Sequence, residues 1–281
     1  MEAMGAFRQG IGLARAGVAM LTDLALAAEC AGCGDPGPVG PTPNRAGRAG
    51  PRGLCPGCAT ALTGMPFPVR RVRGRANLSV VYALARYQEP LSELIIAQKE
   101  HGRLDLARPL GQGLAAVIEA ALADCAADPA AASPASAAPA SAAPVAPAFA
   151  RVLLVPVPSS KAAERRRGQD PVLRMARVAA ARLRRRGVPA EVLRALRHNR
   201  AVADQVGLSG AARAANLAGS MSVTAAAGRV LAGRPLVAVL LDDVYTSGAT
   251  LTEAARALRS APGFRASGGR LAAAVLAGPA R

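Results

Sequence analysis

The sequence is poor in aromatic side chains, which make up 2% of its 281 residues, and it has no tryptophan. Proteins that bind single strands by base stacking interleave aromatic side chains with basic ones, so the composition gives no support for that mode of binding. A hydrophobic fraction of 51% is enough for a core, which must be built from leucine, valine, isoleucine and alanine. The length suits one α/β domain with a smaller appendage.

Long apolar runs are also missing. The apolar stretch at residues 11–28 is interrupted by Arg15 and Asp23, whereas a spanning helix needs about 20 predominantly apolar residues. Glu29, directly before Cys30, departs from a lipoprotein-type cleavage site. We therefore expect no signal peptide, no membrane insertion and a cytoplasmic location.

Acidic residues are about half as frequent as basic ones, 18 against 35, which gives a formal net charge of +17. Residues 161–200 alone hold thirteen lysines and arginines and three acids. A surface of this kind attracts polyanions, either nucleotide phosphates or nucleic acid. A solvated surface in an arginine-rich proteome is the alternative interpretation.

Four of the five cysteines form two pairs, Cys30-Ala-Gly-Cys33 and Cys55-Pro-Gly-Cys58, with 21 residues between them. A two-residue gap lets one turn present two thiolates to the same ion, and four thiolates complete a tetrahedral zinc site. We predict structural zinc at these cysteines, with redox pairs as the alternative. Cys125 lies outside the set.

Composition divides the chain into four segments. Residues 1–70 combine a short helix with a Gly/Pro/Cys-rich, zinc-ribbon-like knuckle that is expected to lack a hydrophobic core, and residues 71–125 are expected to form a hood and the first part of the core. Residues 126–150 are almost wholly Ala, Pro and Ser and predict a disordered insertion. Residues 151–281 alternate apolar strands with helices, which predicts an α/β fold with a parallel sheet flanked by helices. We expect strands at 78–87, 151–157, 190–196, 235–241 and 270–277, and helices at 90–99, 106–125, 171–186 and 251–259.

The most informative segment follows the apolar strand at 235–241. Two carboxylates, Asp242 and Asp243, come next, then a loop of small residues and a helix. Backbone N–H groups of such a loop can close on a phosphate, and the helix N-terminus favours the anion. The carboxylates can accept hydrogen bonds from ribose hydroxyls, so the segment fits a ribose 5-phosphate, with an ordinary turn and capped helix as the alternative. The predicted phosphate-binding residues are Thr246, Ser247, Gly248, Ala249 and Thr250.

This segment resembles the motif by which type I phosphoribosyltransferases bind 5-phosphoribosyl-1-pyrophosphate (PRPP). Val155-Pro-Val-Pro-Ser-Ser160, followed by Arg165-Arg-Arg-Gly168, is similar to the pyrophosphate-side loop of the ComF family, which comprises competence-related phosphoribosyltransferase-like proteins. Together with the cysteine pairs, the resemblance covers nearly the whole chain outside 126–148. Further matches to the family are Lys99, Arg200, Gln205, Leu208, Arg213 and Asn216.

The resemblance implies a type I phosphoribosyltransferase-like sheet and Mg²⁺-dependent transfer of a phosphoribosyl group, with Asp242 and Asp243 as catalytic residues. On the pyrophosphate side it implies Ser159, Arg165, Arg166 and Arg167, with Lys99 and Arg213 as further candidates. Two alternatives stay open: a non-catalytic DNA-uptake or recombination factor that binds single-stranded DNA or a DNA-uptake helicase, and a PRPP-sensing regulator. The acceptor and the general base are not implied, because Thr246 stands where purine salvage enzymes often carry an aspartate.

Overall fold

The computed structural model describes residues 29–36, 53–62, 66–71, 80–127, 150–200, 209–232 and 236–279. The expected N-terminal helix and almost all of the expected insertion at 126–150 lie outside these residues, as do Gln205 and Leu208. Within the described part of the chain, no helix combines the length and apolar character needed to cross a membrane.

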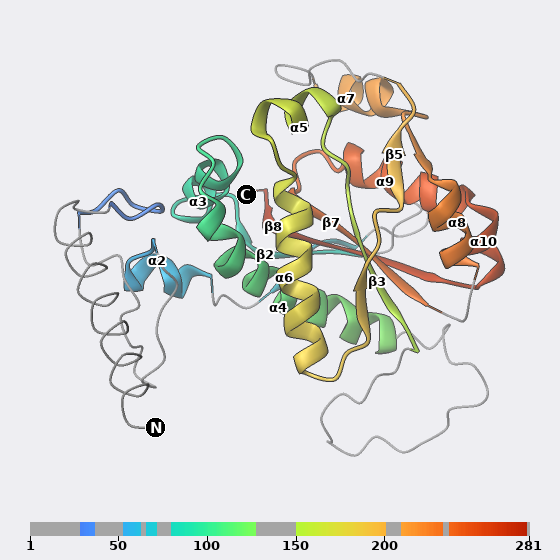
Figure 1. Ribbon diagram of the computed structural model, residues 1–281, viewed down its shortest axis with the longest axis horizontal. Coiled ribbons are helices and arrows are strands. Elements are labelled where there is room, and N and C mark those ends of the chain that lie inside the picture. The colour runs from blue at the N-terminus through green and yellow to red at the C-terminus, as the bar shows by residue number, and fades with distance from the viewer. Residues whose placement is uncertain are drawn as a thin grey trace, which may run out of the picture.

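A six-stranded sheet forms the centre of the molecule, in the order β1-β2-β8-β7-β3-β4 (Figure 1). Five of these strands run parallel, and β1 pairs antiparallel with β2 at one edge. The predicted α/β class, a parallel sheet flanked by helices, is therefore confirmed. The strands are β1 (Phe67–Arg71), β2 (Val80–Arg86), β3 (Val152–Pro156), β4 (Ala190–Val192), β7 (Val237–Val244) and β8 (Arg270–Gly278).

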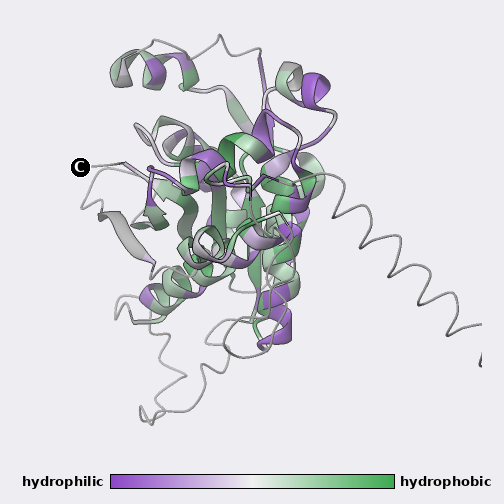
Figure 2. Cartoon of the chain, turned by 90° about the vertical axis from the view of Figure 1, so that its left-hand side faces the viewer, coloured by the Kyte–Doolittle hydropathy of each residue, from purple (hydrophilic) through white to green (hydrophobic). Residues whose placement is uncertain are grey.

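Alternate residues of the central strands face two separate apolar layers, as the two-residue period of a strand requires. Leu154 and Val239 pack with α4 (Ala107–Ala127) and α6 (Pro171–Arg185) on one face. Leu153 and Leu240 pack with α9 (Ala249–Ser260) on the other, and in Figure 1 α6 lies in front of the sheet and α9 behind it. Figure 2 shows the hydrophobic colour concentrated in the sheet and on the helices that cover it. Two short helices, α8 (Ala225–Leu231) and α10 (Pro262–Ala266), join the second layer.

The strand expected at 190–196 is wrong in its extent. The segment forms β4 in the main sheet and then β5 (Leu196–His198), which pairs antiparallel with β6 (Met221–Val223) in a separate two-stranded sheet. The break falls at residues 193–195, where the Leu193 N–H still bonds to the carbonyl of Leu154 before the chain turns away. The polar stretch that follows contains a further helix, α7 (Gly210–Leu217).

The cysteine-rich segment packs on α3 (Leu91–Lys99), which is followed by a short 3-10 helix, η1 (Leu104–Leu106). Leu54 and Leu62, which flank α2 (Pro56–Ala61), are buried in the same apolar cluster as Leu94 of α3. The expectation that the knuckle lacks a hydrophobic core is therefore wrong. Apolar residues between and after the cysteine pairs tie the knuckle to the main core.

Candidate functional site

The connections that leave β3 and β7 run in opposite directions. After β3 the chain passes through α5 (Lys161–Arg167) and α6 to β4, whereas after β7 it passes through α9 and α10 to β8, on the other side and the other face of the sheet. In open α/β sheets the crevice at such a topological switch point, outside the carboxyl ends of the two strands, is where ligands bind. The Val157 N–H bonds to the carbonyl of Leu241 at 2.9 Å. The two segments singled out in the sequence, after β3 and after β7, therefore meet at one edge of the sheet.

The sequence predicts Asp242 and Asp243 to follow the strand. In the structure, both lie within β7, near its carboxyl end. The strand continues to Val244 because its pairing with β8 continues to that residue. Asp242 is partly buried, and Asp243 is only 7% exposed. The carboxylates also accept backbone N–H groups at 2.9 Å, Asp243 N–H to Asp242 and Val244 N–H to Asp243.

Lys99, the last residue of α3, reaches this edge from another part of the sequence. Its Nζ donates to Oδ2 of Asp243 at 2.6 Å. Burial would lower the pKa of Lys99, but the negative charge of Asp243 and its hydrogen bond to the ammonium act in the other direction, and the pKa is raised above its usual value. Lys99 therefore stays charged and balances the carboxylate beside it.

The two aspartates do not share the same electrostatic environment. Burial and, secondly, the neighbouring charge of Asp243 raise the pKa of Asp242 from its ordinary 3.8 to about 8. At neutral pH Asp242 thus retains its proton, and its carboxyl group can both donate and accept a hydrogen bond. The pair offers one donor and several acceptor oxygens to a polyhydroxylated ligand.

The loop between β7 and α9 closes tightly around Tyr245. Gly248, the N-cap of α9, has a φ of 75°, and a Cβ atom added there would lie 2.5 Å from the Tyr245 hydroxyl. The position therefore requires glycine both for its backbone conformation and for its contact with the ring. Thr246 is exposed, and residues 247–250 are partly buried at the start of α9, which begins two residues before the helix expected at 251–259. The Ala249 N–H bonds to Oγ of Ser247 at 3.4 Å.

The resemblance predicts a loop at the arginine run, but the run forms the last turn of helix α5. Oγ of Ser160 caps the helix by accepting the Ala163 N–H at 3.2 Å, and Gly168 ends it with a φ of 65°. The three arginines on this short helix differ in their exposure to solvent. Arg165 and Arg166 are exposed, whereas the side chain of Arg167 is only 9% exposed.

Arg167 connects α5 to the segment after β3 and to the end of α3. Its Nη2 donates to Oγ of Ser159 at 3.5 Å, and its Nη1 to Oε1 of Glu100 at 3.4 Å. Glu100, the residue after Lys99, also accepts from Nη2 of Arg166 at 3.4 Å. Glu100 is not among the residues that the sequence predicts for the site, and no local pattern marks it.

Arg213 lies on α7, which packs against α9, and no hydrogen bond or ion pair among the described residues joins its side chain to Asp242, Asp243 or Arg167. The neighbouring family match, Asn216, accepts Nη2 of Arg200 at 2.6 Å through its backbone carbonyl. These residues hold the chain around α7 together. The structure thus brings Lys99 to Asp243 and Arg167 to Glu100, the residue after Lys99, whereas Arg213 has no such contact with these residues.

The four paired cysteines converge as the sequence predicts. Their Sγ atoms all lie within 4.8 Å of one another, and those of Cys33 and Cys55 are 3.7 Å apart. A tetrahedral site with Zn–S bonds of about 2.3 Å requires sulfur atoms roughly 3.8 Å apart, so the cluster can hold a metal ion with little rearrangement. Although burial disfavours the thiolate, N–H groups of Cys55 and Gly32, 3.3 and 3.4 Å from Sγ of Cys30, lower the pKa of Cys30 to about 6.

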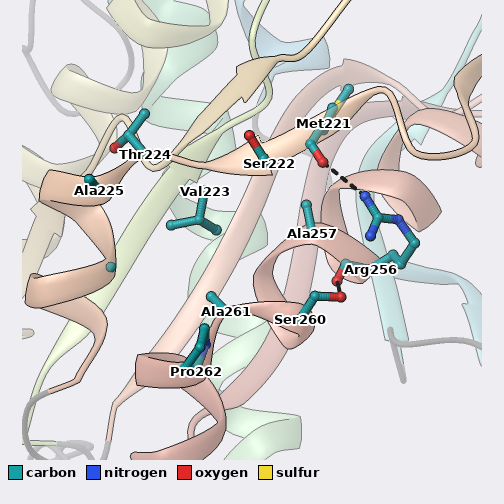
Figure 3. A pocket seen from close by; sticks show the side chains of 11 residues that line it. Met221, Ser222, Val223, Thr224, Ala225, Arg256, Ala257, Ser260, Ala261 and Pro262 are labelled. Carbon is teal, nitrogen blue, oxygen red and sulfur yellow. Dashed lines mark hydrogen bonds between the residues drawn. The ribbon is translucent and has the colours of Figure 1, made fainter.

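A separate pocket of about 350 Å³ lies between β6, the start of α8 and the C-terminal half of α9 (Figure 3). Its polar side chains hold the protein together. Arg256 donates to the carbonyl of Met221, Ser260 donates to the carbonyl of Arg256, and Thr224 caps α8 by accepting the Ala227 N–H. Lys99, Asp242 and Asp243 lie elsewhere, at the carboxyl ends of β3 and β7, the place called the β3–β7 edge below.

Comparison with known proteins gives no match to a family model and none to a curated protein. The function is therefore inferred from the residues and their geometry.

Proposed function

We propose that the chain binds PRPP at the β3–β7 edge, on a type I phosphoribosyltransferase-like fold of the ComF kind, and transfers its phosphoribosyl group to an acceptor. The observation that carries the proposal is the meeting of four features at one topological switch point. These are the adjacent carboxylates of Asp242 and Asp243, the small-residue loop at the start of α9, the ammonium of Lys99 and the buried guanidinium of Arg167.

Each part of PRPP has a chemical counterpart in this arrangement. The carboxyl groups of Asp242 and Asp243 suit the two ribose hydroxyls, because one of them retains a proton and both offer acceptor oxygens. Residues 246–250 suit the 5-phosphate, with backbone N–H groups and the positive end of α9 facing the anion. Arg167 and Arg166 suit the pyrophosphate, since a guanidinium binds two phosphate oxygens at once.

Transfer of the phosphoribosyl group breaks the bond between the ribose C1 and pyrophosphate, so positive charge develops on the ribose while negative charge leaves with pyrophosphate. Fixed charges that meet these changes lower the barrier. Asp243 lies beside the ribose in this arrangement, and Arg167 beside the leaving group. Mg²⁺, when bound, would neutralise part of the pyrophosphate charge, and the carboxylate oxygens here are of the type it prefers.

We propose further that the cysteine cluster holds a structural zinc ion. Four thiolates leave no open position for a substrate, and the apolar residues beside the cysteines belong to the main core. The metal then shapes the surface on which α3 rests and takes no part in group transfer.

The test is calorimetric titration of the parent and of the Asp242→Asn/Asp243→Asn variant with PRPP, with and without Mg²⁺. A hydrogen bond to ionised Asp243 contributes about 1.5–3 kcal/mol and one to protonated Asp242 about 0.5–1.5 kcal/mol, so the double variant should lose about one and a half to three orders of magnitude in affinity. Asp105→Asn, which removes a carboxylate from the exposed Arg103–Asp105 pair, is the control and should bind as the parent does. Equal PRPP affinity in the parent and in the double variant would refute the ribose assignment.

A further inference from the structure

The guanidinium of Arg167 is buried without a full set of partners. Its side chain is only 9% exposed, yet its two contacts, at 3.4 and 3.5 Å, exceed the usual 2.7–3.2 Å of a good hydrogen bond. Its Nε is buried and has no acceptor among the described residues. A buried charge is costly unless it is paired and hydrogen-bonded, so this part of the site has the capacity to bind an anion more closely than it does here.

Glu100 supplies part of the missing negative charge. One carboxylate oxygen faces Nη1 of Arg167 and the other faces Nη2 of Arg166, each at 3.4 Å, and the Glu100 side chain is 44% exposed. Both contacts are long and open to water, so they are weak. The adjacent Lys99–Asp243 pair, at 2.6 Å, is much closer and fixes the end of α3 against β7. The end of α3 therefore places a cation on the aspartate side of the site and an anion on the arginine side.

We infer that Glu100 is an internal counter-anion that occupies the position of the pyrophosphate group, and that an anionic ligand displaces it. This inference rests on the proposed function. It adds Glu100 as the residue that sets how tightly Arg166 and Arg167 bind a pyrophosphate group. A pyrophosphate group carries more charge and more acceptor oxygens than one carboxylate, and can complete the partners of Arg167. Because the two contacts of Glu100 are long, little is lost when it swings into solvent.

The inference separates ligands by chemistry. Glu100 competes only with groups that reach Arg166 and Arg167, so it weakens the binding of inorganic pyrophosphate and of PRPP. Ribose 5-phosphate has no such group, and its affinity should not depend on Glu100. A site in which Glu100 merely orients the arginines gives the opposite result, since removing it would then weaken the pyrophosphate ligands.

The experiment titrates inorganic pyrophosphate, PRPP and ribose 5-phosphate into the parent, Glu100→Gln and Glu93→Gln at fixed ionic strength. Glu93 is an exposed residue of the same helix, so its substitution removes the same charge without touching the arginines. Glu100→Gln should bind pyrophosphate and PRPP about 2- to 30-fold more tightly than the parent, as expected for the loss of two partly exposed ion pairs. Ribose 5-phosphate should bind all three proteins alike.

Unchanged or weaker pyrophosphate binding by Glu100→Gln, in a parent that binds PRPP, overturns the inference and leaves the proposed function standing. An equal gain in Glu93→Gln overturns it too, because the effect would then be general charge. If neither the parent nor Glu100→Gln binds any of the three ligands, the proposed function fails and the inference fails with it. Glu100→Ala, checked for folding by urea denaturation, repeats the test should the glutamine variant not fold.

Discussion

Replacing Asp242 by asparagine is expected to stabilise the fold while it weakens ligand binding. Burial and the charge of Asp243 raise the pKa of Asp242 to about 8. Between pH 4 and pH 8 the folded protein therefore holds a proton that the unfolded chain releases, and its stability falls as the pH rises through this range. Asparagine has nearly the same shape and no proton to lose, so the stability of the variant lacks this dependence on pH.

The magnitude follows from the pKa and from the position of the side chain. If the whole difference between 3.8 and about 8 acted on stability, the free energy of unfolding would change by ~6 kcal/mol. Asp242 is partly solvated, and water screens the charge. We therefore expect Asp242→Asn to be more stable than the parent by ~1–3 kcal/mol at pH 9, and by less than that at pH 5.

Urea denaturation of both proteins at pH 5 and pH 9 measures this difference. Asp105→Asn is a control of the opposite sign. Burial would raise the pKa of Asp105, but the hydrogen bond and charge of Arg103, together with backbone N–H groups, lower it. That carboxylate therefore stabilises the fold above about pH 4 and loses its effect only in more acidic solution. The control should cost less than ~1 kcal/mol, equally at both pH values. A gain for Asp242→Asn that is the same at pH 5 and pH 9, or a loss at pH 9, would refute the reasoning.

Three further outcomes are expected. Gly248→Ala should lose ~1–3 kcal/mol of stability, measured by urea denaturation, because alanine is strained at a φ of 75° and its methyl group meets the ring of Tyr245. A variant as stable as the parent would mean that the loop rearranges freely. Glu253→Gln should lose ~1–3 kcal/mol of stability at pH 7 and less below pH 4, because the bond from Arg256 lowers the pKa of Glu253 although burial would raise it. Thermal melts at both pH values measure the loss, and an equal loss at both would mean that the Arg256–Glu253 pair is unimportant. Cys55→Ser should purify with less than half an equivalent of zinc by elemental analysis, and a full equivalent would exclude the four-cysteine site.

The central sheet was predictable because its signals are local. The apolar runs at 152–156 and 237–241 read as buried strands, and parallel strands with helical connections bring their carboxyl ends to one edge. That rule also places Asp242 next to the segment after β3. The helical form of the arginine run had a local signal as well, since Ser160 and Gly168 are typical residues for the two ends of a helix.

Other parts of the site could not be predicted from any local pattern. Lys99 and Asp243 are 144 residues apart in the sequence, and only the tertiary fold, which places the end of α3 next to Asp243, brings them together. Glu100 follows Lys99 into the site for the same reason. The departure of β5 from the main sheet is likewise a tertiary effect, because it depends on pairing with β6, which lies 23 or more residues further along the chain.

The packing of α3 also connects the cysteine cluster to the site. A Cβ atom added at Gly32 would lie 2.8 Å from Sγ of Cys58 and 3.3 Å from a methyl group of Leu94, so only glycine lets the first cysteine turn approach α3 this closely. Leu94 is fully buried, and five residues later the same helix presents Lys99 to Asp243. A metal ion that fixes the four cysteines thus fixes the surface against which α3 is held.

Loss of the metal should therefore weaken ligand binding from a distance. We expect Cys55→Ser, and the parent after treatment with a chelator, to bind PRPP at least several-fold less tightly, because the end of α3 no longer holds Lys99 in place. Gly34→Ala is a matched control in the same loop: its added methyl group meets no atom within 4 Å, although its φ of 74° makes the substitution strained. That variant should keep its metal and its affinity. Metal-free protein that binds PRPP as tightly as the parent would show that the contacts of α3 with the sheet are sufficient to position Lys99 without the cysteine cluster.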